Sequence, residues 1–141
     1  MFLAGSGGGG GGGGADRTTN IIRGGNGGNG HYWAYTDAMG INSGVACSIA
    51  IGAGGGAGKS EAPAYNGGDG ELTSIMYFNE YGRQVEGWDP GYGGNAASGD
   101  GATGEDGISY DTSGKGAKGG AGATLTTDAE PGENGWLTIS W

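Results

Sequence analysis

The run of eight consecutive glycines at residues 7–14 limits what this chain can fold into more than any other feature. A segment without side chains adds nothing to an apolar core, and glycine makes up 40 of the 141 residues, against a usual share of about 7%. Large apolar residues are few: four Leu, eight Ile, two Val and two Phe. This composition argues against a doubly wound sheet, a helix bundle or a coiled coil, which bury many more such side chains. With only 3 Pro and no sustained Gly-X-Y register, a collagen helix is also excluded.

Several glycine-rich stretches repeat glycine at every third residue. An extended left-handed helix of the polyproline II type has three residues per turn and makes no hydrogen bonds within itself. Glycine at every third position leaves one face bare, so neighbouring helices can approach and pair their backbone groups. Flexible linkers are the alternative, but linkers are usually rich in serine, which is scarce beside these glycines. We therefore expect packed polyglycine II helices, with these registers: Gly24, Gly27 and Gly30; Gly52, Gly55 and Gly58; Gly101, Gly104 and Gly107; Gly116, Gly119 and Gly122.

Short stretches of alternating apolar residues separate the glycine blocks and predict a few strands. Residues 45–51 place Val45, Ile49 and Ile51 on one face, together with Cys47, which we expect to be a small core residue. Residues 136–141 place Leu137, Ile139 and Trp141 on one face. Residues 2–4 predict a very short strand, and residues 72–81 predict a strand or a hairpin arm.

The predicted fold class is irregular or mainly β. It is a polyglycine II helix bundle, or sandwich, flanked by a few short β-strands, with little or no α-helix. We expect residues 1–141 to form a single glycine-rich domain. The 4 Trp, 7 Tyr and 2 Phe argue against a disordered chain, because disordered segments are poor in aromatic residues.

The charge is acidic, with 6 Lys and Arg against 15 Asp and Glu. A net charge of -9 disfavours nucleic acid and anionic membranes as partners, because phosphate binding needs clustered basic side chains. The single Cys47 excludes an internal disulfide and is compatible with assembly in a reducing compartment. The apolar start at residues 1–4 is too short for a signal peptide, and no stretch is long enough to span a membrane.

Two glycine-containing segments resemble ligand-binding loops. Residues 53–60 satisfy a relaxed phosphate-loop pattern ending in Lys59 and Ser60, but residues 61–68 will not sustain the helix that such a loop must open. Residues 99–107 place carboxylates between glycines, without the spacing of a calcium loop. We therefore expect no metal, no cofactor and no nucleotide.

Two aromatic groups are the candidates for receptor contact. The first is His31, Tyr32, Trp33 and Tyr35; the second is Tyr77, Phe78, Tyr81 and Trp88. Tyr and Trp offer large contact areas at low entropy cost and stack on the faces of sugars. The alternative is that these side chains cap the ends of the glycine bundle. No partner for His31 has the spacing of a catalytic triad or a zinc site, so no catalytic residue is predicted.

The order of these segments resembles a known family. An apolar strand enters polyglycine at residues 2–14, a strand ends in Ile-Gly-Ala-Gly-Gly at residues 51–55, and the chain closes with Gly-Trp-Leu-Thr-Ile-Ser-Trp at 135–141. This is similar to the glycine-rich C-terminal domain at the tips of bacteriophage tail fibres and to the detachable adhesins of T-even-like phages. The resemblance implies a sandwich of polyglycine II helices with variable loops at one end that bind the host surface.

The expected function is that of a non-enzymatic virion component, made in the host cytoplasm and located in the tail fibre or on the particle surface. Its expected partners are other virion or fibre proteins and a bacterial surface glycan or outer-membrane protein, without nucleic acid or membrane insertion. The sequence leaves open whether the chain forms a homo-oligomer. A fibre or capsid decoration subunit without a receptor is the alternative. An ice-binding protein would need regular ranks of Thr or Ala, which the sequence lacks.

Overall fold

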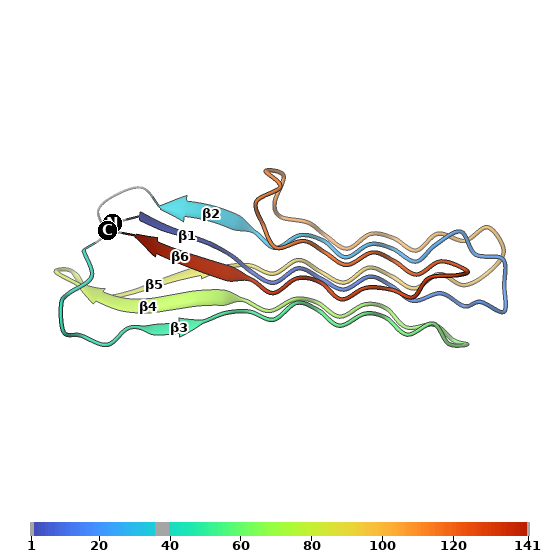
Figure 1. The fold of residues 1–141 in the computed structure, drawn as a ribbon, viewed down its shortest axis with the longest axis horizontal. Coiled ribbons are helices and arrows are strands. Elements are labelled where there is room, and N and C mark those ends of the chain that lie inside the picture. The colour runs from blue at the N-terminus through green and yellow to red at the C-terminus, as the bar shows by residue number, and fades with distance from the viewer. Residues whose placement is uncertain (1, 36–39, 141) are drawn as a thin grey trace.

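The computed structural model describes residues 2–35 and 40–140 and has the shape of an elongated molecule with two unlike halves (Figure 1). Short strands gather at one end, and extended segments run from them to the opposite end. Phe2 and Ser140 are register partners, so both ends of the described chain lie at the strand end. Residues 2–35 and 40–140 contain no helix, which confirms the expected irregular, mainly β class with little or no α-helix.

Two three-stranded antiparallel sheets form the strand end. The first has the order β2-β1-β6, with β1 at Phe2–Ser6, β2 at Tyr32–Tyr35 and β6 at Trp136–Ser140. The second has the order β3-β4-β5, with β3 at Ser48–Ala50, β4 at Thr73–Asn79 and β5 at Gly82–Trp88. The strands predicted near residues 2–4, 72–81 and 136–141 are thus confirmed within the described residues, and Trp141 lies outside them.

A small apolar core lies between the two sheets. Alternation along β4 turns Ile75 and Tyr77 inward, where they meet Leu3 of β1 and Trp88 of β5, and all four are buried. Gly5 of β1 lets the indole approach, because a Cβ there would lie 2.9 Å from two ring atoms of Trp88. Four half-buried residues complete the cluster: Tyr35, Ile41, Leu137 and Ile139. Leu137 and Ile139 lie on β6, as the predicted strand at residues 136–141 requires, and both pack against this core.

The strand predicted over residues 45–51 is shorter and more exposed than expected. Only Ser48–Ala50 pairs, and Val45, Ile49 and Ile51 are between 44% and 48% exposed. The reason is that β3 is the outer strand of its sheet and pairs with β4 alone. Ile49 lies opposite the buried Ile75 but at the open edge of the core. The prediction that Cys47 is a core residue was also wrong, because its side chain is exposed.

The other half of the molecule consists of extended glycine-rich segments, here called rods 1 to 8. They occupy residues 7–14, 21–30, 52–59, 65–71, 91–97, 102–110, 117–123 and 129–135. Rod 1 lies at the centre, and its backbone pairs with six neighbours. The amides of Gly7, Gly10 and Gly13 donate to rod 2 and the residue after it; Gly8, Gly11 and Gly14 donate to rod 4, and Gly9 and Gly12 donate to rod 8.

The carbonyl groups of rod 1 repeat with the same period of three. Those of Gly8, Gly11 and Gly14 accept from rod 5, while Gly9 and Gly12 accept from rod 3, and Gly10 and Gly13 accept from rod 7. The chain order along each pair shows that the three rods accepting from rod 1 run antiparallel to it, and the three rods donating to it run parallel. From Gly8 to Gly14, rod 1 therefore pairs its amide and carbonyl groups with backbone groups alone, while the carbonyl of Gly7 accepts from the hydroxyl of Ser6.

This central position explains the run of eight glycines. A Cβ on Gly10, Gly11 or Gly12 would overlap the carbonyl oxygen of Tyr92, Gly56 or Ala121, in rods 5, 3 and 7 respectively. Every residue of rod 1 faces a neighbour in this way, so no position tolerates a side chain. A rod at the periphery needs glycine only where it faces inward.

The predicted glycine registers fit this arrangement with one exception. Gly24, Gly27 and Gly30 abut the carbonyls of Gly13, Gly10 and Gly7, and the other registers abut neighbouring backbone in the same way. Gly101 is the exception: it faces open space with φ of 71° and belongs to a turn. The period of three is that of a polyglycine II helix. The assignment of this backbone conformation to the rods stays a prediction.

Side-chain oxygens of Asn, Asp and Glu complete the lattice where a rod lacks a neighbour. Asn26 and Asn29 on rod 2 accept from the amides of Gly122 and Gly119, each at 3.0 Å. Asn66 and Asp69 on rod 4 accept from rod 5 in the same way, at 2.8 Å. Asn134 accepts from the amide of Gly54 at 3.0 Å. These side chains take the place of a backbone carbonyl, so the buried or half-buried amides keep a partner.

Candidate functional site

Four turns gather at the end opposite the sheets (Figure 1). They comprise residues 15–20, 60–64, 98–101 and 124–128, and each joins two consecutive rods. We call this surface the turn tip. A small buried apolar cluster where the rods meet the turns supports it and consists of Ala15, Ile21, Ala97 and Ala123. Glycine is less frequent in these turns than in the rods, so the turn tip carries side chains of several kinds.

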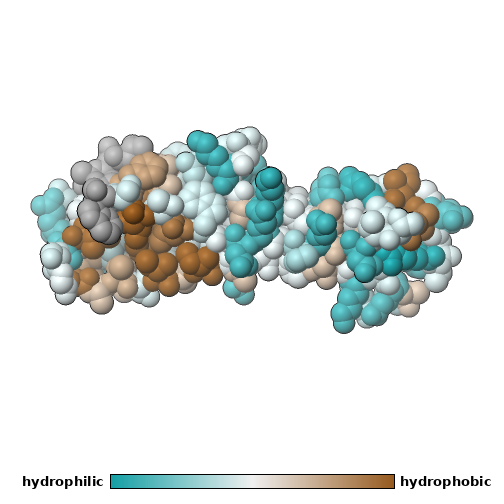
Figure 2. Space-filling view, in the orientation of Figure 1, coloured by the Kyte–Doolittle hydropathy of each residue, from teal (hydrophilic) through white to brown (hydrophobic). Residues whose placement is uncertain are grey.

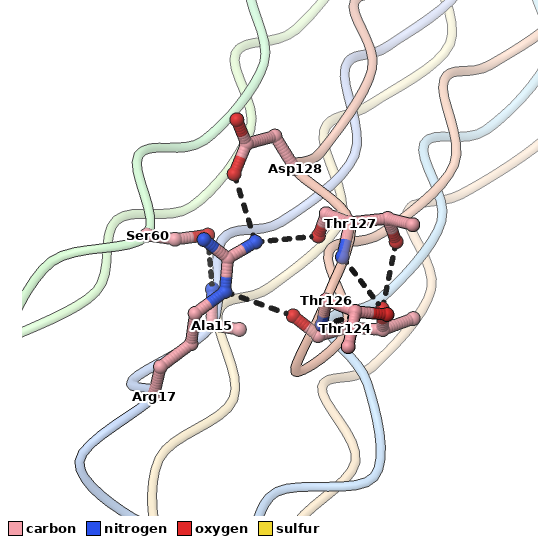
Figure 3. Close-up of polar contacts among 7 residues, drawn as sticks. All are labelled: Ala15, Arg17, Ser60, Thr124, Thr126, Thr127 and Asp128. Carbon is pink, nitrogen blue, oxygen red and sulfur yellow. Dashed lines mark hydrogen bonds and ion pairs between the residues drawn. The ribbon is translucent and has the colours of Figure 1, made fainter.

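Arg17 connects the first turn to the fourth (Figure 3). Its Nε donates to the carbonyl of Thr124 at 3.1 Å, and one terminal nitrogen donates to the carbonyl of Thr127 at 2.7 Å. The same nitrogen forms an ion pair with Asp128 at 2.8 Å. Within the fourth turn, the hydroxyl groups of Thr124 and Thr127 are hydrogen-bonded to each other. The fork of the guanidinium group thus holds two turns in one arrangement.

Asp16 connects the first turn to the third. One carboxylate oxygen accepts from the amide and hydroxyl of Thr18, and the other accepts from the hydroxyl of Ser98 at 3.1 Å. The hydrogen bonds from Thr18 hold the pKa of Asp16 below its ordinary value. Two further bonds join the same turns, from the amide of Asn20 to Asp100 and from Gly99 to Thr19. The negative charge on Asp16 is therefore part of what orders the turn tip.

The second turn is joined through Ser60. Its hydroxyl oxygen accepts from the amide of Ala15 at 3.1 Å, as Figure 3 also shows. The backbone around this turn differs from that of a phosphate loop. Residues 52–59 form an extended rod, and no helix begins after Lys59. In a phosphate loop the hydroxyl oxygen of Ser60 would bind magnesium. Here it accepts a hydrogen bond from the backbone amide of Ala15.

Two of the carboxylates in residues 99–107, those of Asp100 and Asp106, accept hydrogen bonds within the fold. Asp106 accepts from Arg23 at 3.0 Å and from the amide of Asn26 at 2.8 Å. The hydrogen bond from Arg23 is the main reason that the pKa of Asp106 lies below its ordinary value. In the part of the chain that the structure describes, no group of three or more His, Cys, Asp or Glu side chains could hold a metal ion.

The exposed residues of the turn tip are mixed in character. They include the hydroxyl groups of Thr18 and Thr126, the charged Asp100 and Asp128, and the apolar Leu125, which is 45% exposed. Glu61 and Pro63 are exposed in the second turn. A surface with apolar, hydroxyl and charged groups held in fixed positions is suited to recognising another molecular surface.

The first predicted aromatic group lies at the strand end, on and just before β2. Trp33 is 53% exposed, whereas His31, Tyr32 and Tyr35 are half-buried. The rings form a chain of contacts: centroid distances are 6.4 Å from His31 to Trp33, 6.4 Å from Trp33 to Tyr35 and 6.2 Å from Tyr35 to Trp88. Burial and a hydrogen bond with Glu86 raise the pKa of Tyr35 to about 12. Of this group, Trp33 offers the most surface.

The second aromatic group is divided between core and surface. Tyr77 and Trp88 are fully buried, so their prediction as contact residues was wrong. The inward faces of β4 and β5 carry both, and burial raises the pKa of Tyr77. Phe78 points the other way on β4 and is half-buried. Tyr81, in the turn between β4 and β5, is 83% exposed. Both aromatic groups therefore lie at the strand end, away from the turn tip.

Sequence reasoning missed the turn tip as a unit. Its signal was present in the short interruptions of the glycine blocks; three of the four turn segments contain no glycine, and residues 124–128 are the clearest of them. The sequence did not indicate that four such segments meet. That convergence follows from the alternating direction of the rods, which only the backbone pairing fixes.

Neither the comparison with protein-family models nor the search of curated proteins finds a match to this chain. Among the residues that the structure describes, there is no helix of the length and apolar character needed to cross a membrane. The function is therefore argued from the geometry of the chain itself.

Proposed function

We propose that this protein is a bacteriophage virion component, a tail-fibre tip that binds the host surface through the turn tip. One observation carries the proposal: the four turns at residues 15–20, 60–64, 98–101 and 124–128 meet at one end, where side chains tie them together. The rods pack mainly through backbone groups, so most of the contacts that hold them do not involve side chains of the turns. Such a scaffold permits large changes at the contact surface without changes in the fold.

Preorganisation of the turns supports a binding role. A loop that is ordered before binding loses less conformational entropy when the complex forms, and its affinity is correspondingly higher. Arg17, Asp16 and Ser60 provide that order by joining the first turn to each of the other three. Repetition of the protein around a virion would add avidity to individually weak contacts.

The proposed activity is binding without catalysis. His31 stacks on Trp33, and the carboxylates Asp16 and Asp106 accept hydrogen bonds within the lattice. The proposed partners are a bacterial glycan or outer-membrane protein at the turn tip and other virion or fibre proteins elsewhere, and the proposed location is the particle surface. The assignment to a bacteriophage is based on the resemblance of the segment order to phage tail-fibre tips.

The proposal is tested by locating the chain in a purified particle and by competing for host adsorption. Antibody fragments against the chain should label the distal end of the fibre in electron micrographs. Purified protein should inhibit adsorption, and the Leu125→Ser and Thr126→Ala variants should inhibit it less. Val85→Ser, a change of an exposed residue on β5, is the matched control and should inhibit as well as the parent protein.

The decoration-subunit alternative makes the opposite prediction. Labels would then lie along a shaft or over the capsid, and neither the parent protein nor a turn variant would compete for adsorption. That result, with all proteins folded, would replace the receptor-binding proposal.

A further inference from the structure

A hollow of about 520 Å³ lies at the strand end, between the turn that joins β4 to β5 and residues 40–42. Polar side chains with an aromatic ring among them line it: Asn42, Asn79, Glu80, Tyr81 and Gln84, with Ile41 on the apolar side. Its volume is within the range of small-molecule sites, about 300–1,000 Å³. It lies at the opposite end of the molecule from the turn tip, and Figure 2 shows that apolar residues also gather over the strand end.

Backbone contacts fix the walls of this hollow. The amide of Asn42 donates to the carbonyl of Phe78 on β4 at 2.9 Å, and this bond attaches one wall to the sheet. The side-chain oxygen of Asn79 accepts from the amide of Tyr81 at 2.9 Å, which stabilises the turn. Gly82 completes the turn with φ of 100°, a conformation that favours glycine. Ile41 packs against the core between the sheets.

The polar groups around the hollow are available to a ligand. No hydrogen bond or ion pair to another described residue uses the side chains of Asn42, Glu80 or Gln84. The side-chain NH₂ group of Asn79 can also donate a hydrogen bond, since the turn uses the oxygen of that side chain. An amide side chain donates and accepts at once, so several of them can satisfy adjacent hydroxyl groups, which also do both.

We propose that this hollow is a carbohydrate site that binds a neutral pyranose. The 83% exposed ring of Tyr81 offers a flat apolar face for the C–H face of the sugar. Asn42, Asn79 and Gln84 would bond the ring hydroxyl groups, with Glu80 as an acceptor. A neutral sugar is favoured over an acidic one, because no Lys or Arg is among the described residues that line the hollow and the net charge is -9. This site is separate from the proposed receptor surface and does not depend on binding there.

The test is saturation-transfer NMR with the purified chain and the methyl glycosides of glucose, galactose, mannose and N-acetylglucosamine. At least one should receive saturation from the protein, and the methyl glycoside of glucuronic acid should not. Tyr81→Ala should weaken binding about tenfold or more, as loss of an aromatic anchor usually does. Gln84→Ala should also weaken it, and Tyr81→Phe should retain it.

Tyr65→Ala is the matched control, because Tyr65 is an exposed tyrosine of rod 4 next to the turn tip. It should bind sugars as the parent protein does. Thermal unfolding of each variant separates a loss of binding from a loss of folding. The proposal is overturned if no sugar in the panel receives saturation, or if folded Tyr81→Ala binds like the parent. Either outcome leaves the adsorption experiment on the turn tip unaffected, so the two proposals fail separately.

Discussion

The indole Nε1 of Trp88 donates a hydrogen bond to the backbone carbonyl of Trp33 across a distance of 3.0 Å. Trp88 belongs to β5 and Trp33 to β2, so this bond joins the two sheets. It also satisfies the one polar atom of a fully buried side chain. The two tryptophans, which the sequence offers as equal candidates for contact with a receptor, therefore have different roles.

We expect Trp88→Ala to lower the free energy of unfolding by about 3–5 kcal/mol, the usual cost of removing a buried aromatic ring. Trp33→Ala should cost much less, because that side chain is 53% exposed and its carbonyl group is kept. Chemical denaturation of both variants measures the difference. Equal loss of stability in the two variants would contradict the assignment of Trp88 to the core.

A second prediction concerns two glycines in different rods. Gly10→Ala should destabilise strongly, because the new Cβ would overlap the carbonyl of Tyr92 and separate rods 1 and 5. Each backbone group left unpaired costs about 1–3 kcal/mol. Gly56→Ala is the control, since a Cβ there has nothing within 4 Å. Thermal unfolding should show a large decrease in Tm for the first variant and little change for the second.

The glycine registers illustrate how far the sequence predicts this fold. The spacing of Gly24, Gly27 and Gly30 was sufficient to predict a bare face against neighbouring backbone. It could not identify the neighbours, because glycine carries no side-chain pattern that distinguishes one rod from another. The central place of rod 1 follows from its eight glycines only once six surrounding rods are known.

The aromatic residues show the opposite limit. Ile75 and Tyr77 alternate along β4, yet the alternation alone does not say which face is covered. Because the chain has so few large apolar residues, Tyr77 and Trp88 supply much of the volume of the core. Residue types that often mark a contact surface are therefore buried here. Val45 and Ile51 are exposed for the complementary reason, since residues 2–35 and 40–140 contain no further strand that covers them.

A third prediction concerns the side chains that replace missing rods. Asn26→Ala should destabilise by about 1 kcal/mol or more, because the amide of Gly122 loses its acceptor. Asn26→Asp keeps an acceptor oxygen and should cost less. Asn20→Ala is the control, because the side chain of Asn20 is exposed and makes no hydrogen bond to another described residue. The stability of this variant should match that of the parent. Urea unfolding curves compare the three variants.

A fourth prediction concerns acid. Burial raises the pKa of Asp111, but hydrogen bonds from Ser113 and Gly116 outweigh it, and the pKa stays below its ordinary value. A carboxyl group with a lowered pKa stabilises the fold above the unfolded value of about 3.9, and this contribution is lost as the pH falls through the folded pKa. The turn at residues 111–116 should therefore loosen below about pH 4.

Asp111→Asn is expected to be less stable than the parent at pH 7 and to lose less stability on acidification. Melting temperatures recorded from pH 7 down to pH 2 measure both effects. Glu61→Gln removes an exposed carboxylate in the second turn and is the matched control. A parallel acid profile for Asp111→Asn and the parent would show that this carboxylate does not contribute to the pH dependence.

A fifth prediction tests the polyglycine II assignment. The amides of residues 7–14 all donate to backbone carbonyls of other segments, so their hydrogen exchange should be slow, whereas Glu61 and Ala62 in an exposed turn should exchange quickly. Far-ultraviolet circular dichroism should show the signal of an extended left-handed helix without an α-helical component. Rapid exchange throughout residues 7–14 would contradict packed rods.

The period of three in the central lattice also restricts how the gene can change. Insertion of a single codon into rod 1 would shift every later residue by one place in this period of three, so each amide would face the wrong neighbour. Only a gain or loss of three codons preserves the pairing, and the neighbouring rods must change length with it. The turns carry no such restriction. Natural variants should therefore differ in steps of whole helical turns along the rods, and freely in both length and composition at the turn tip.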